Sequence, residues 1–64
     1  MPKLNEEFIT IQASIVRETE RAMLIEYHGE NIWIPISQVE GVDADFLPPK
    51  ITLTAWIAKE KGII

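Results

Sequence analysis

Apolar and polar residues alternate along the chain from residue 8 to residue 16. Four apolar residues share one side of this alternation: Ile9, Ile11, Ala13 and Ile15. Successive side chains of a β-strand point to opposite faces, so a period of two predicts a half-buried strand over this stretch. Val16 follows Ile15 with no polar residue between them, which indicates a β-bulge or a passage of the strand beneath a covering element.

Two further strands are predicted at residues 22–27 and 31–36, with a hairpin turn around Gly29. The turn is formed either by Gly29 and Glu30 or by His28 and Gly29, because glycine adopts the positive φ that tight hairpin turns need. The two alternatives shift the pairing by two residues, and such a shift leaves every side chain on the same face. One face of the hairpin is apolar in both alternatives: Met23, Ile25, Tyr27, Ile32, Ile34 and Ile36. The other face carries Leu24, Glu26, His28, Asn31, Trp33 and Pro35.

The segment after the hairpin is rich in residues that interrupt regular structure. Pro35 has no N–H to donate, so it predicts that the third strand ends at a sheet edge or leaves the sheet there. Residues 40–49 combine acidic residues with Gly and Pro and predict an acidic loop. Within this loop, Phe46 and Leu47 are expected to close one end of the core. The alternation then returns and predicts a fourth strand at residues 51–54.

The last segment changes its period and predicts a short helix over residues 55–61. Thr54 is suited to cap the N-terminus of this helix, and Gly62 occupies the usual position just beyond its C-terminus. Ile63 is expected to fold back on the helix. Together the elements predict a mainly β fold. This fold is an antiparallel meander of four or five strands, curled into a small barrel or open sandwich of the SH3-like or OB-like kind, with the helix capping one opening.

The chain has 64 residues, enough apolar material for one core, and we expect residues 1–64 to form a single small β domain. Residues 1–7 are expected to be a loose N-terminal segment, and they contain no apolar signal-peptide region. No apolar run approaches the length needed to cross a membrane. These features predict a cytoplasmic protein with no membrane partner.

The composition limits the kinds of ligand and partner that we expect this chain to bind. The chain has no Cys and a single His, which argues against a disulfide scaffold and against a structural zinc site, so we expect neither metal nor cofactor. Its net charge of −4 has the wrong sign for a protein held to phosphates, which disfavours nucleic acid without removing it. Hydrophobic residues make up 47% of the chain, and one small core will not cover all of them. Binding of a protein partner, or of a second copy, is therefore expected.

Three segments resemble a group of short uncharacterised proteins from phages, prophages and bacteria. They are IVRETERA at residues 15–22, GENIWIPISQV at residues 29–39 and WIAKEKG at residues 56–62. The chain departs from the shared pattern at Ile36, where Lys is common, and at residues 54–55, where Pro-Glu often starts the helix. The resemblance implies a compact β domain in a mobile-element setting, and it implies no particular activity.

The first candidate site is an interaction patch opposite the apolar face of the hairpin. Its residues are Leu24, Glu26, Trp33 and Pro35. An exposed Trp in an apolar patch is a suitable anchor for a partner. The structural alternative, which we favour, is that this face is covered: either the C-terminal helix lies across it through Trp56 or Ile57 and buries Trp33, or the sheet closes into a barrel.

The second candidate site is a stacking platform for single-stranded nucleic acid. Its residues are Arg17, Arg21, Tyr27 and Trp33. In such platforms aromatic rings stack on bases and cations meet phosphates. Strand parity argues against it, because Tyr27 and Trp33 point to opposite faces, and acidic residues stand between the cations. A solvated turn of mixed charge is the favoured interpretation of the arginines.

The sequence offers only weak candidates for catalytic or metal-binding residues. His28 stands between Glu26 and Glu30 at a hairpin turn, where a surface role is favoured over a general base. Asp43 and Asp45 resemble the start of a calcium loop but lack the remaining ligands. We therefore predict no enzyme. We expect a small interaction module, an accessory protein of a phage or mobile element, with single-stranded nucleic-acid binding as the alternative.

Overall fold

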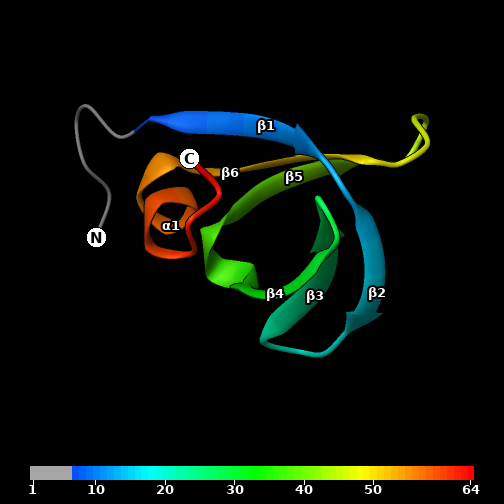
Figure 1. The fold of residues 1–64 in the computed structure, drawn as a ribbon, viewed down its shortest axis with the longest axis horizontal. Helices are drawn as coiled ribbons and strands as arrows, with labels where there is room; N and C mark the ends of the chain where they lie inside the picture. The colour runs from blue at the N-terminus through cyan, green and yellow to red at the C-terminus, as the bar shows by residue number, and fades with distance from the viewer. Residues whose placement is uncertain (1–6) are drawn as a thin grey trace.

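The computed structural model describes residues 7–64, and six strands, a 3-10 turn and one helix follow one another in it (Figure 1). The elements are β1 (Phe8–Gln12), β2 (Ser14–Glu18), β3 (Ala22–Tyr27), β4 (Glu30–Pro35), η1 (Ile36–Gln38), β5 (Val39–Asp43), β6 (Lys50–Thr54) and α1 (Ala55–Glu60). All strand pairs are antiparallel. The predicted mainly β fold with a short C-terminal helix is thereby confirmed.

The strands form two three-stranded sheets, in the orders β1-β6-β5 and β2-β3-β4. β1 and β2 are the two halves of the strand predicted from residue 8 to residue 16, and the chain turns from one sheet into the other between them (Figure 1). The break falls at Ala13, whose N–H donates to the carbonyl of Pro49 at 3.1 Å and so extends the β1-β6 register by one residue before the chain enters β2. The prediction of four or five strands is therefore corrected to six. Over residues 7–64 the strands form an open two-sheet arrangement and not a closed barrel.

One apolar core receives side chains from both sheets and from α1. Its buried members are Ile11, Ala13, Met23, Ile25, Ile34, Ile51, Leu53, Ile57 and Ala58. Ile25, Ile34, Ile51 and Leu53 are completely buried, and burial of each such side chain contributes about 1.5–3 kcal/mol. The inner face predicted from the alternation is therefore the face that the fold buries.

The β3-β4 hairpin turns at His28 and Gly29, so Tyr27 lies opposite Glu30 and Met23 lies opposite Ile34. The φ angles of the two turn residues are 54° and 83°. Positive φ at both central positions is the signature of the type I′ turn, which matches the right-handed twist of paired strands. The structure thus selects one of the two registers that the sequence left open.

The acidic loop predicted over residues 40–49 is wrong in its first part, because Val39–Asp43 forms β5. The pairing of β5 with β6 changes register between Val39 and Gly41, so a bulge interrupts the alternation that would have indicated a strand. Most of β5 is also exposed, and it therefore lacks the apolar face on which the prediction of strands relied. The loop itself is confined to residues 44–49.

The prediction that Phe46 and Leu47 close one end of the core is wrong. Asp43 pairs with Lys50 at the end of the β5-β6 hairpin, so the loop extends beyond both sheets (Figure 1). Leu47 is 93% exposed and Phe46 is 40% exposed. The Phe46 ring instead lies 4.0 Å from the Lys50 ammonium, a cation–π contact at the surface.

The ends of α1 are formed as the sequence predicts. The Thr54 hydroxyl accepts a hydrogen bond from the Ile57 N–H at 3.2 Å and donates one to Gln38 Oε1 at 2.7 Å. At the other end Gly62 has a φ of 74°, and Ile63 donates its N–H to a carbonyl of the helix at 2.8 Å and packs against the core. This pattern is the Schellman motif.

The loose segment predicted for residues 1–7 lies outside the described residues except for Glu7. The backbone carbonyl of Glu7 accepts a hydrogen bond from the Ala55 N–H at 2.9 Å. This bond joins the residue before β1 to the first residue of α1. The helix therefore packs against β1 and β6, on the sheet that does not carry Trp33.

Candidate interaction face

The two sheets present different outer faces. In the β1-β6-β5 sheet the residues of β1 and β6 that alternate with the buried ones are mostly polar: Thr10, Gln12, Lys50 and Thr52, with Phe8, 46% exposed, at the start of β1. The hydroxyls of Thr10 and Thr52 lie 2.8 Å apart on this face. The outer face of the β2-β3-β4 sheet is mainly apolar, and we call it the Trp33 face. Its residues are Ser14, Val16, Arg17, Ala22, Leu24, Glu26, Asn31, Trp33 and Pro35.

Trp33 lies halfway along β4, the edge strand of this sheet, and the register places it in a row with one residue of each other strand. Trp33 on β4 is opposite Leu24 on β3, and Leu24 is opposite Arg17 on β2. Trp33 is 41% exposed, and Leu24 beside it is half-buried. A cation therefore stands at one end of a row that has an aromatic side chain at the other.

A β-bulge in β2 enlarges the apolar part of the Trp33 face. The pairing with β3 changes register between Ile15 and Arg17, which confirms the bulge that the sequence indicated. Val16 and Arg17 thus occupy the space opposite the single residue Leu24. Val16 is 53% exposed, so its side chain does not enter the core. The bulge therefore presents a second large apolar side chain to solvent near Leu24.

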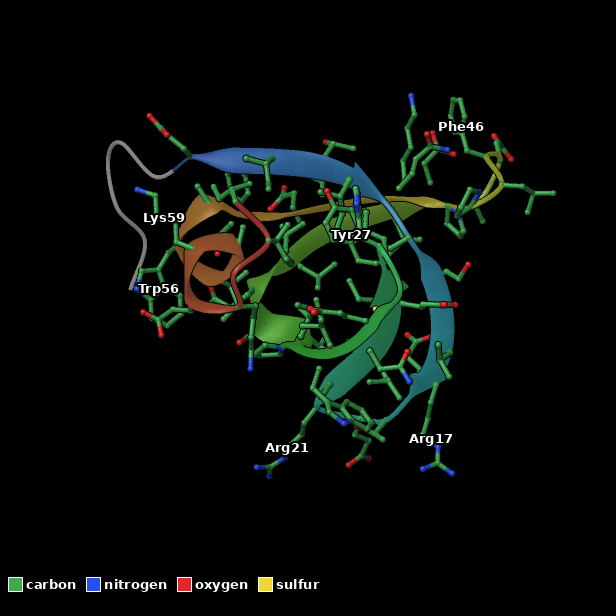
Figure 2. All side chains as sticks on the ribbon, viewed as in Figure 1. Arg17, Arg21, Tyr27, Phe46, Trp56 and Lys59 are labelled. Carbon is green, nitrogen blue, oxygen red and sulfur yellow. The ribbon has the colours of Figure 1, made fainter. Side chains whose placement is uncertain are left out.

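The expectation that α1 buries Trp33 is wrong. The helix packs against β1 and β6 and inserts Ile57 and Ala58 into the core. Trp56 is 60% exposed, and Figure 2 shows it at the α1 end of the molecule, away from the end that carries Arg17. From this position the helix does not cover the Trp33 face, and its first residue, Ala55, is hydrogen-bonded to Glu7 at the start of β1, on the other sheet.

The four residues of the nucleic-acid alternative do not share one surface. Arg17 lies in the row of Trp33, but Tyr27 is half-buried on the inner side of the sheet and packs against the core. Its ring centroid is 4.1 Å from that of His28. Figure 2 shows Arg17 and Arg21 extending from the β2-β3 end of the molecule, whereas Tyr27 lies at the other end of β3. The predicted separation of Tyr27 from Trp33 therefore holds in three dimensions.

A shallow depression adjoins the Trp33 face at the end of β4. It is lined by Glu20, Arg21, Ile36 and Ser37. The Ile36 N–H donates to the carbonyl of Arg21 at 2.8 Å, which holds the start of η1 against the β2-β3 turn. Sequence analysis missed this depression because its residues come from two turns that only the hairpin register brings together.

The other candidate residues take local structural roles. His28 is an exposed residue of the type I′ turn. Asp43 Oδ1 accepts a hydrogen bond from the Asp45 N–H at 3.1 Å, which orders the start of the loop. Within residues 7–64 no group of three potential metal ligands comes together. In the same part of the chain, no helix has the length and apolar character to cross a membrane.

The fold and the site together define a small two-sheet β protein with one mostly polar outer face and one on which apolar residues surround Trp33. No family model matches the chain, and no curated protein or solved structure matches it either. The resemblance of its three segments to short phage and bacterial proteins therefore stays a prediction.

Proposed function

We propose that this chain is a small, non-enzymatic interaction module that binds a protein partner through the Trp33 face. The observation that carries the proposal is the position of Trp33, which is 41% exposed and opposite Leu24 on the outside of a sheet. Binding energy at protein interfaces concentrates in a few central residues, and Trp is enriched among them. A large aromatic side chain with apolar neighbours on a rigid sheet is well suited to this role.

The surroundings of Trp33 support a protein partner over a nucleic acid. Val16 and Leu24 extend the apolar surface, while Arg17 and Glu26 stand at its margins with opposite charges. Protein interfaces commonly combine an apolar centre with a polar rim. A groove for a phosphate backbone requires predominantly positive charge, and the whole chain carries −4.

The remaining parts of the proposal rest on the sequence. With one His, no Cys and no recognisable nucleophile motif, the chain offers no catalytic constellation. The resemblance to short phage and bacterial proteins leads us to propose a cytoplasmic accessory protein of a phage or another mobile element.

The proposal is tested by selecting peptides from a random library against the intact protein and mapping where they bind. We expect the amide signals of the Trp33 face to shift in NMR spectra while those of Thr10 and Thr52 stay in place. Trp33→Ala should weaken binding by about thirtyfold or more, since truncation of a hot-spot residue costs ~2 kcal/mol or more. Selected peptides that map elsewhere, or that bind equally well to Trp33→Ala, contradict the proposal.

A second measurement separates the protein partner from nucleic acid. The Trp56→Phe variant leaves Trp33 as the single indole, so its fluorescence reports on this face alone. Titration with single-stranded oligonucleotides at low salt should leave the emission unchanged. Quenching that weakens as salt rises would support the nucleic-acid alternative instead.

A further inference from the structure

β4 stands at the edge of its sheet, and its hydrogen-bond pattern shows which backbone groups face outward. The Ile36 N–H donates to the Arg21 carbonyl, so these two residues form a hydrogen-bonded pair. Such pairs alternate along an antiparallel ladder, and the pairs involving Ile34 and Ile32 therefore also bond to β3. The N–H and C=O groups of the residues between them, Asn31 and Trp33, point away from β3.

We propose that a second copy of this chain adds its own β4 to this edge, antiparallel, with Trp33 opposite the partner's Trp33. The inference rests on the proposed function, because it names the partner of the same surface. In this register Trp33 exchanges two hydrogen bonds with the partner's Trp33. The Asn31 N–H donates to the carbonyl of the partner's Pro35, which is the N-cap of η1 and accepts one hydrogen bond from that turn, so its second lone pair serves Asn31. Pro35 has no N–H, so the edge offers no donor at that position. The added ladder is therefore short.

Charge selects this register. Placing Trp33 opposite the partner's Trp33 also brings Glu30 opposite the partner's Ile36, which lines the shallow depression together with Arg21 and Ser37. Arg21 is the next residue along that row, since it bonds to Ile36 within its own sheet. Glu20 also lines the depression, from the turn before Arg21. The side chains of Glu30 and of the partner's Arg21 are both long. The carboxylate of Glu30 can therefore reach the guanidinium of the partner's Arg21 in this depression.

The neighbouring pairings are less favourable. A register with Trp33 opposite the partner's Asn31 places Glu30 beside the partner's Ile34, which is completely buried and has no cation in its row. Addition of β4 to the partner's β5 would bring Glu30 toward a strand that carries Glu40 and Asp43. Like charges across strands are destabilising. The symmetric pairing also places the two Trp33 rings side by side on one continuous outer face, with Leu24 flanking each ring.

The test is the oligomeric state of the intact chain, measured by sedimentation equilibrium from micromolar to millimolar concentration. We expect a reversible dimer, and isotope-edited NMR of mixed labelled and unlabelled chains should show contact between the Ile32 Hα and the Hα of the partner's Ile34. Asn31→Pro removes one outward N–H and no bond to β3, so it should abolish dimerisation. Asn31→Thr keeps that N–H and is the matched control.

Charge reversal tests the register. Glu30→Arg and Arg21→Glu should each weaken the dimer about threefold to tenfold, because an exposed ion pair occurs twice in a symmetric dimer and becomes repulsive. The double variant should regain the original affinity. A chain that stays monomeric at millimolar concentration, or dimerises equally well as Asn31→Pro, overturns the inference. If peptides still bind the Trp33 face of such a monomer, the proposed function stands and only the dimer is contradicted. If neither dimerisation nor peptide binding is observed, the dimer and the proposed function are both contradicted.

Discussion

Trp33 and Leu24 lie directly opposite each other on β4 and β3, with both side chains on the outside of the sheet. They form a non-hydrogen-bonded pair, the type in which opposed side chains approach most closely. The register therefore places the Leu24 side chain beside the indole of Trp33, which is 41% exposed. Any change at Leu24 should be visible in the environment of Trp33.

Leu24→Ala in the Trp56→Phe background should shift the Trp33 emission to longer wavelength, because the indole loses its apolar neighbour and gains water contact. Thr52→Ala, on the outer face of the other sheet, should leave the emission in place. Fluorescence spectra of the folded proteins provide the measurement. An unchanged spectrum for Leu24→Ala would mean that the two side chains do not touch in solution.

Ile34→Val should lower the free energy of unfolding by about 0.5–1.5 kcal/mol, because it removes one methyl group from a completely buried side chain. The matched change is Val16→Ala at the exposed bulge, which should alter stability by no more than about 0.5 kcal/mol. Urea denaturation followed by circular dichroism measures both. Equal losses at the two positions would contradict the assignment of inner and outer faces.

Thr54→Ala should destabilise the fold by about 1–2 kcal/mol, because it removes the cap of α1 and a hydrogen bond to Gln38 in a buried site. Thr54→Ser keeps the hydroxyl and should recover most of this loss. A cycle with Gln38→Ala measures how much of the effect belongs to the bond between η1 and α1. Additive effects in this cycle would show that the two side chains act independently.

Gly29→Ala should cost about 1–2 kcal/mol, because residue 29 has a φ of 83° that an L side chain adopts only with strain. Gly41 provides the matched control, since a Cβ built there meets nothing within 4 Å and no positive φ is required. Gly41→Ala should be neutral or stabilising by up to about 1 kcal/mol. Thermal unfolding of the two variants measures the difference in stability. A Gly29→Ala variant as stable as the original protein would contradict the type I′ turn.

Leu47→Ser should leave the free energy of unfolding within about 0.5 kcal/mol, because the side chain is 93% exposed and contributes no burial. This outcome distinguishes the observed loop from the sequence-based expectation that Leu47 closes the core. Denaturant unfolding gives the measurement. A loss above about 1 kcal/mol would show that the loop packs against the core in solution.

Much of the candidate site follows from strand parity. Alternation alone placed Met23 and Ile34 inside and put Trp33 on the opposite face, because the side-chain period of a strand is two whatever its partner. The bulge at Val16 was also visible, as a local break in that period. The depression beside Arg21 was not, since its lining comes together only when the hairpin register and η1 are known.

The amino-acid sequence specifies the local elements: alternating strands, a glycine-containing turn, and a short helix with Thr54 and Gly62 at its ends. These depend on interactions between residues that are near one another in sequence. The tertiary structure alone decided that the first strand bends at Ala13 into two sheets, that residues 39–43 form a strand, and that α1 packs away from Trp33. Each of these features depends on which distant segments of the chain pack together. Hydrophobic periodicity identifies the apolar face of an element, but it does not identify the segment that packs against that face.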